Sequence, residues 1–234
     1  MVHRATELGL DALVFTEHNV MWPTEELTAL QARHPEIRLF RGVEITTDSG
    51  DHLLIYGVFD GDVLRQGVDG AELTAHVQSL GGAVVLAHPY RYGPAVPTFL
   101  NDRPVDGIEV LSNNMLNYAH EQAQRLCARL GAHPVAASDG HHVNTVGMYA
   151  LDSHCEVTSE RELADVLRRG AYGLWVDEER VAAANANLPQ LVADVEELIA
   201  LGRDDDEIHR ELGGLGYTTI RGVRNGLDVG RPMQ

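Results

Sequence analysis

Short apolar runs alternate with amphipathic helical patterns along most of the chain, and this alternation limits the fold more than any other feature. Runs rich in Val, Ile, Leu and Ala predict strands at Ala12–Thr16, Ile37–Glu44, His52–Val58, Ala83–Ala87, Gly107–Leu111 and Pro134–Ala137. Between and after them, periodic patterns and capping residues predict helices at Thr24–Ala32, Ala71–Leu80, Asn114–Leu130 and Ser159–Arg168. This succession predicts a parallel sheet with helical crossovers, in a barrel or an open α/β sheet.

The two ends of the chain differ from this pattern. Val2–Leu8 reads as a helix, whereas a β/α barrel normally opens on a strand. Near the other end a single apolar stripe predicts a long helix that packs on the main domain, with the members Leu188, Leu191, Val192, Val195, Leu198 and Ile199. Two short helices, Asp204–Leu212 and Thr218–Leu227, should follow. We therefore expect a main domain over 1–176 and a helical extension over 177–234.

Composition excludes several functional classes. Apolar residues make up 44% and charged residues 23% of the 234 residues, as in ordinary globular proteins. The formal charge of -17 disfavours broad electrostatic binding of nucleic acid. All 18 cationic residues are Arg, which excludes a P-loop lysine or a Schiff base. With two well-separated cysteines, no basic leader and no long apolar run, we expect a cytoplasmic protein without disulfides, cysteine zinc sites or membrane segments.

Ligand-type side chains gather at the predicted carboxyl ends of the strands, the rim that holds the active site in barrels. Four strands carry such residues at or just after their ends: His18, Glu44, His88, Asp139 and His141. His52 begins the strand after Glu44, where the returning chain brings it toward the same rim. Imidazole and carboxylate without thiolate suit zinc, manganese or iron, and a carboxylate can bridge two cations. A single histidine or aspartate after a strand is usually a cap or surface residue, so the prediction of a polynuclear hydrolytic site depends on their joint placement.

An ordered set of short motifs then becomes informative. It consists of Thr16-Glu17-His18-Asn19, Gly42-Val43-Glu44, His52-Leu53-Leu54, Ala87-His88-Pro89, Gly107-Ile108-Glu109-Val110 and Ser138-Asp139-Gly140-His141. This order resembles that of the PHP (polymerase and histidinol phosphatase) domain family over about residues 3 to 150. The resemblance implies a distorted (β/α)7 barrel, up to three divalent metals (Zn, Mn or Fe) at its mouth, and a metal-dependent phosphoesterase that uses a metal-bridged hydroxide.

The resemblance also assigns roles to positions. It implies that Glu44 bridges two metals and is catalytic, that His52 and His88 complete the second metal's ligands, and that Asp139, also catalytic, binds the first metal. His18 and His141 would hold the third metal. Arg91, three residues after His88, is our candidate for binding a substrate phosphate through its guanidinium, against the alternative of a surface arginine.

The chain departs from the family pattern in two ways. Glu17 stands where the family usually has Asp, and the opening strand with its His-x-His motif is absent, so we expect a barrel that lacks its first strand. A wrong start site, a degenerate homologue and a shortened chain are the competing explanations, and we favour the first because a missing strand would expose sheet edges.

Other residues near the rim are ambiguous. Glu109 either orients a group of the site or is an exposed rim carboxylate. Asn113 and Asn114 are assigned to the start of the following helix.

Two other classes of function compete with a phosphoesterase. The missing motif favours a non-catalytic PHP module with a binding or regulatory role, and amide or ester hydrolysis would use similar ligands. The expected partner is a small phosphorylated substrate, such as histidinol phosphate, a nucleotide or a short oligonucleotide. The last two predicted helices faintly resemble a helix-turn-helix with Arg221, Arg224 and Arg231 on its second helix, but we do not expect the acidic chain to bind DNA there.

Overall fold

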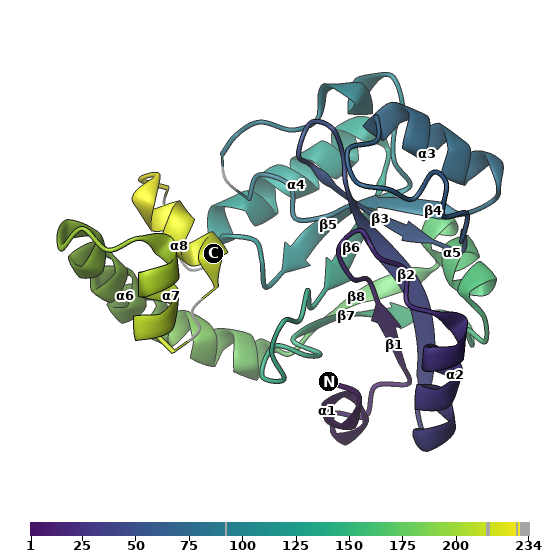
Figure 1. Ribbon diagram of the computed structural model, residues 1–234, viewed down its shortest axis with the longest axis horizontal. Coiled ribbons are helices and arrows are strands. Elements are labelled where there is room, and N and C mark those ends of the chain that lie inside the picture. Colours follow the sequence, from purple (N-terminus) through teal and green to yellow (C-terminus); the bar gives the residue numbers. More distant parts are fainter. Residues whose placement is uncertain (92, 214–215, 228, 230–234) are drawn as a thin grey trace.

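The main body of the computed structural model is a strongly curled sheet with helices packed around it (Figure 1). The structure describes residues 1–91, 93–213, 216–227 and 229. The sheet has the order β1-β2-β3-β4-β5-β6, which is also the order of the strands along the chain. Its strands are Ala12–Phe15, Arg38–Thr46, His52–Tyr56, Ala83–Leu86, Gly107–Ser112 and His133–Ala137. Each of the six predicted strands is present, with ends shifted by one or two residues.

The prediction of a parallel sheet with helical crossovers was wrong for β3. β1 pairs in parallel with β2, and β4, β5 and β6 are parallel to one another, but β3 runs antiparallel to both β2 and β4. The reason is the length of the connection. β2 ends at Thr46 and β3 starts at His52, so the intervening loop is too short for a crossover and can form only a hairpin.

Helices pack on both faces of the curled sheet. On the outer face lie α1 (Val2–Glu7), α2 (Thr24–Arg33), α3 (Gly70–Ser79) and α4 (Asn117–Leu130), with a short 3-10 turn at Thr98–Asn101, whereas α5 (Glu160–Arg169) packs on the opposite face. The side chains of Asp69 and Ser159 cap α3 and α5 by accepting backbone N–H bonds, as their residue types favour. All four residues of β4 are buried, because α3 and α4 pack on one face of the strand and α5 packs on the other.

A separate hairpin, β7 (Tyr149–Ser153) and β8 (Tyr172–Val176), was not predicted. The run in β7 is interrupted by Asp152, whereas the apolar and aromatic residues of β8 are a strand signal that the prediction missed. The hairpin lies beside β6, where the Ser138 hydroxyl donates to the Tyr149 carbonyl at 2.9 Å and accepts from the Gly147 N–H at 2.8 Å.

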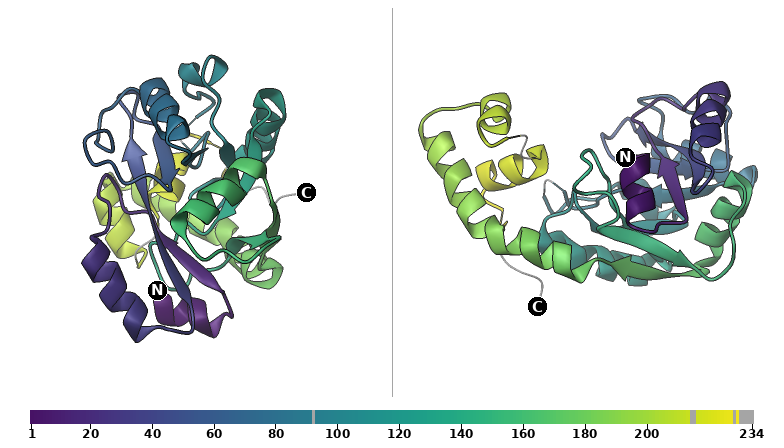
Figure 2. Two further views of the ribbon diagram at one scale, coloured as in Figure 1. Left: turned by 90° about the vertical axis from the view of Figure 1, so that its right-hand side faces the viewer. Right: turned by 90° about the horizontal axis from the view of Figure 1, so that it is seen from below.

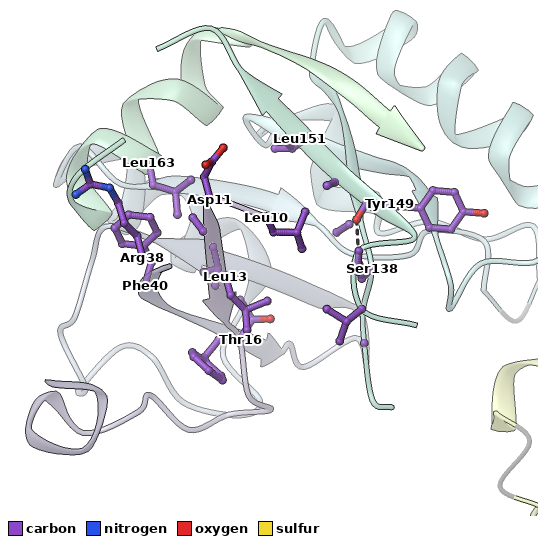
Figure 3. A pocket seen from close by; sticks show the side chains of 18 of the residues that line it. Leu10, Asp11, Leu13, Thr16, Arg38, Phe40, Ser138, Tyr149, Leu151 and Leu163 are labelled. Carbon is purple, nitrogen blue, oxygen red and sulfur yellow. Dashed lines mark hydrogen bonds between the residues drawn. The ribbon is translucent and has the colours of Figure 1, made fainter. Parts of the chain in front are cut away.

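The curled sheet does not close. Among the described strands β1 and β6 are its two edges, and a cavity of about 1710 Å³ lies between β1 on one side and β6 and β7 on the other. Figure 3 shows Leu10 and Leu13 beside this space and Leu151 across it. The fold is therefore a mixed α/β half-barrel, and the closed (β/α)7 geometry of the PHP type remains a prediction.

The last three helices form an arm that extends from the main body and folds back toward it (Figures 1 and 2). α6 (Glu178–Ala200) leads away from β8, and α7 (Asp205–Glu211) and α8 (Tyr217–Arg224) return. The predicted packing of the apolar stripe on the main domain was wrong. Val195 of the stripe is buried against Ile208 of α7 and Ile220 of α8, because these helices fold back on α6 and form a small core of their own. The division at residues 176 and 177 stays a proposal.

Two arginines of the segment that faintly resembles a helix-turn-helix form ion pairs within the arm. Arg221 and Arg224 pair with Asp205 at 3.1 and 2.9 Å, respectively. Arg231 lies outside the described residues. No helix among the residues described has the length and apolar character needed to cross a membrane.

Candidate metal centre

Glu44 is the centre of a cluster of histidines at one end of the curled sheet. It lies near the end of β2 and is only 4% exposed. The Nε2 atom of His88 lies 3.0 Å from its Oε1, and the Nδ1 atom of His52 contacts the same oxygen. The Nδ1 atom of His18 lies 3.7 Å from the other oxygen, Oε2. Three imidazoles from separate segments therefore surround one buried carboxylate.

Strand register explains why these residues meet. β1 continues past its last residue into a bridge between His18 and Glu44, which sets His18 beside the carboxylate. Thr46 is opposite His52 in the β2–β3 hairpin, so the start of β3 lies at the end of β2. The antiparallel direction of β3 thus brings His52 to the rim where the parallel strands end. The sequence-based expectation that the returning chain would do this agrees with the register.

Asn19 fixes the end of β1 against β2. Its backbone lies in the left-handed region with φ 58°, which asparagine tolerates better than most residues. Its N–H donates to the Glu44 carbonyl at 2.7 Å, and its side-chain oxygen accepts from the Thr46 N–H at 2.8 Å. These bonds keep the His18 segment in register beside Glu44.

Glu109 contacts the backbone of His88 and is only 2% exposed, so the alternative of an exposed rim carboxylate was wrong. Its Oε2 accepts the backbone N–H of His88 at 2.7 Å, at a residue whose φ is 28°. Burial raises the pKa of Glu109 well above its usual value, and the nearby Asp139 carboxylate adds to the effect. Glu109 therefore supports the backbone of a histidine of the cluster rather than the solvent-facing rim.

Asp139 and His141 form a second group beside the first. The Nδ1 atom of His141 lies 3.5 Å from Asp139 Oδ1, and the His141 and His18 rings have centroids 6.2 Å apart. Asp139 follows β6 with φ 43° and is mostly buried, whereas the His141 side chain is 57% exposed. The two groups are linked through His18, which faces both.

The electrostatics of Glu44 favour its charged form. Burial raises the pKa of this carboxyl, but hydrogen bonds and charge interactions with His52 and His88 outweigh burial and hold its pKa well below the usual value. A buried carboxylate that stays ionised, with imidazole nitrogens at its oxygens, is a donor set suited to divalent cations. Within the described part of the chain, donor atoms of His18, Glu44 and His52 all lie within 4.8 Å of one another. The residues present thus fit a metal centre.

Arg91 lies next to this centre, held by two polar contacts. Its Nε donates to the Thr218 hydroxyl at 2.7 Å and its Nη2 donates to Asn114 Oδ1 at 3.3 Å. Together with His52 and His88 it lines a pocket of about 360 Å³ at the mouth. The predicted site residues are therefore brought to one end of the sheet, while their roles as ligands and phosphate contact remain predictions.

Asn114 is a residue that sequence reasoning misplaced. The helix α4 starts at Asn117 rather than at the predicted Asn114, because the Asn114 side chain is engaged at the rim. It donates to Asp139 Oδ2 at 2.5 Å and accepts from Arg91 and from Thr218. Its position just after β5, at the rim of the other site residues, was the signal that could have identified it. No comparable local signal marks Thr218, which lies in α8.

Comparison with known families extends this picture. A family model described as PHP-associated matches residues 117–172. This segment of the chain is therefore similar to PHP-associated proteins. The matched segment runs from α4 to β8 and includes Asp139 and His141 of the candidate centre, while the Glu44 cluster precedes it.

Solved structures share the fold of this chain at low sequence identity. PsfC from Pseudomonas syringae PB-5123 is 18% identical, with a TM-score of 0.58 over 79% of this chain and 86% of that protein. Endonuclease Q, in a complex with a 27-mer duplex carrying an abasic lesion at the active site, is 12% identical, with a TM-score of 0.50 over 75% of this chain and 52% of that protein. No curated protein sequence matches the chain. At these identities the structural likeness concerns the fold.

Proposed function

We propose that this protein is a hydrolase that cleaves a phosphate ester with the help of divalent cations. The observation that carries the proposal is the buried, ionised Glu44 surrounded by His18, His52 and His88, next to a pocket lined by Arg91. Asp139 and His141 extend the donor set on the side of His18. In our proposal all six ligand-type residues hold cations, and zinc, manganese and iron suit their chemistry.

Divalent cations, when bound, would lower the pKa of an attacking water and neutralise charge on phosphoryl oxygens. The chain's own contribution is to hold the ligands rigidly. One carboxylate oxygen of Glu44 contacts the ring nitrogens of both His52 and His88. The Glu109 carboxylate accepts a hydrogen bond from the backbone N–H of His88. Because these partners are buried, ligand positions change little when a substrate enters.

Arg91 would bind the phosphate. A guanidinium presents its donors in a fixed plane, which suits the oxygens of a phosphate better than a flexible ammonium does. Its contacts with Thr218 and Asn114 orient that plane beside His88. A pocket of about 360 Å³ favours a small phosphorylated compound or the end of a nucleotide chain over a bulky substrate. The fold shared with an endonuclease that acts on DNA supports phosphate esters of nucleotides as candidates.

The proposal is tested by removing the negative charge of Glu44. The Glu44→Gln variant keeps the size of the side chain but no longer offers an ionised oxygen, so it should lose at least about tenfold in affinity for Mn²⁺ or Zn²⁺. Its hydrolysis of p-nitrophenyl phosphate and of nucleoside monophosphates should fall below about 1% of wild type. Metal content is measured by elemental analysis after dialysis, and hydrolysis by release of phosphate.

Glu26→Gln provides the matched control, because Glu26 is an exposed carboxylate on α2, away from the histidine cluster. It should bind metal and hydrolyse substrate as the wild type does. Equal metal content in Glu44→Gln and wild type would contradict the assigned centre. A wild-type protein that binds metal and phosphate but hydrolyses none of these esters would favour the alternative of a non-catalytic PHP module.

A further inference from the structure

The arm contacts residues next to the candidate centre through the buried hydroxyl of Thr218. Thr218 lies in the first turn of α8 and is 3% exposed, although its helix belongs to the extension beyond the half-barrel. It contacts both Arg91 and Asn114, residues that are 127 and 104 positions earlier in the chain. Figures 1 and 2 show how α7 and α8 fold back so that α8 approaches the main body.

The hydrogen bonds around Thr218 have only one consistent direction. A guanidinium N–H only donates, so the Thr218 oxygen accepts from Arg91 Nε at 2.7 Å and its single proton goes to Asn114 Oδ1 at 2.9 Å. With its oxygen thus used, Asn114 turns its amide N–H toward Asp139 Oδ2 at 2.5 Å. A directed chain of bonds therefore runs from Arg91 through the arm to the carboxylate of Asp139.

Close packing holds α8 in this place. Gly222 lies one helical turn after Thr218, and a Cβ atom there would meet the Leu116 Cδ1 atom at 2.7 Å and the Val229 Cγ2 atom at 3.0 Å. Leu116 immediately precedes α4 and is buried. The absence of a side chain at Gly222 therefore permits the approach that brings the Thr218 hydroxyl to Arg91.

From these contacts we infer that Thr218 is a positioning residue for phosphate recognition and that the arm forms part of the substrate site. The Thr218 hydroxyl fixes the plane of the Arg91 guanidinium and the orientation of the Asn114 amide. This inference rests on the proposed function, because it gives Arg91 a phosphate to bind. It predicts that docking of α8 controls affinity for phosphate and leaves the metal ligands intact.

Four substitutions test the inference. Thr218→Val keeps the shape of the side chain but cannot make either bond, and it should weaken binding of inorganic phosphate to the Mn²⁺-loaded protein about tenfold. Thr218→Ser retains the hydroxyl and should bind phosphate within about twofold of wild type. Gly222→Leu should push α8 from Leu116 and weaken binding as Thr218→Val does, whereas Gly216→Leu should not, because a Cβ at Gly216 meets no atom within 4 Å. Phosphate affinity is measured by titration calorimetry and metal content by elemental analysis, which should be unchanged in all variants.

A second measurement separates this inference from the proposed function. The Arg91 Nε–H resonance, assigned from its loss in Arg91→Lys, should exchange slowly with solvent in the wild type and in Thr218→Ser, and rapidly in Thr218→Val. Slow exchange in Thr218→Val, or equal phosphate affinities of Thr218→Val and Thr218→Ser, would overturn the positioning role. If the wild type bound no phosphate but showed this exchange pattern, the proposed function would fail while the positioning of Arg91 by the arm would stand.

Discussion

Replacing His120 with glutamine should make the free energy of unfolding depend less on pH below neutrality. His120 lies on α4, is 3% exposed and faces the ring of Tyr149 at a centroid distance of 6.5 Å. Burial lowers the pKa of His120 to about 4, and a hydrogen bond with the Ser112 backbone opposes this effect only in part. In the unfolded chain the imidazole titrates near its ordinary pKa of about 6.5.

The sign of the effect follows from proton binding. Between these two pKa values the unfolded chain holds a proton on His120 that the folded protein does not, so the free energy of unfolding falls as the pH falls. The difference between a pKa of about 6.5 in the unfolded chain and about 4 in the folded protein corresponds to about 3 kcal/mol in total, of which about 2 kcal/mol is lost by pH 5. This contribution is present above pH 6.5 and disappears as the pH approaches 4.

Urea unfolding at pH 7 and pH 5, followed by tryptophan fluorescence, measures the effect. Between these conditions the wild type should lose about 2 kcal/mol more than His120→Gln. All other side chains are the same in both proteins, so the comparison isolates the contribution of His120. His3→Gln is the control, because the His3 side chain is 85% exposed, and it should follow the wild type. Equal losses in wild type and His120→Gln would refute the reasoning.

Two further predictions concern Arg91 and Gly82. Arg91→Lys keeps the charge but not the planar fork, so phosphate affinity should fall about tenfold with metal content unchanged, and an unaltered affinity in calorimetry would remove Arg91 from the phosphate site. Gly82→Ala should destabilise the fold by about 1–3 kcal/mol in urea unfolding, because its Cβ would meet the Val58 Cγ2 atom at 2.5 Å and the Tyr56 carbonyl oxygen at 2.8 Å. Gly173→Ala, with no atom within 4 Å of its Cβ, should cost much less, and equal costs would contradict this packing argument.

The elements with strong local signals could be predicted from the sequence. The apolar runs of β1 to β6 and the periodic patterns of α2 to α5 depend on neighbouring residues, so their existence and order followed from the pattern. The placement of His18, Glu44, His88 and Asp139 at strand ends gave the candidate centre, because the ends of parallel strands share one edge of a sheet. The hairpin of β7 and β8 was not predicted, although the apolar and aromatic residues of β8 favour a strand.

Only the tertiary structure decided how distant parts of the chain complete this centre. The direction of β3 follows from a short loop and brings His52 to Glu44, while Asn114 leaves its predicted helix to contact Asp139. The apolar stripe of α6 predicted a buried face but not its partner, since any apolar surface of the right shape can cover it. The residues next to Thr218 in the sequence do not predict its contact with Arg91. Their contact depends on the return of α8 and on close packing at Gly222, which are properties of the folded chain as a whole.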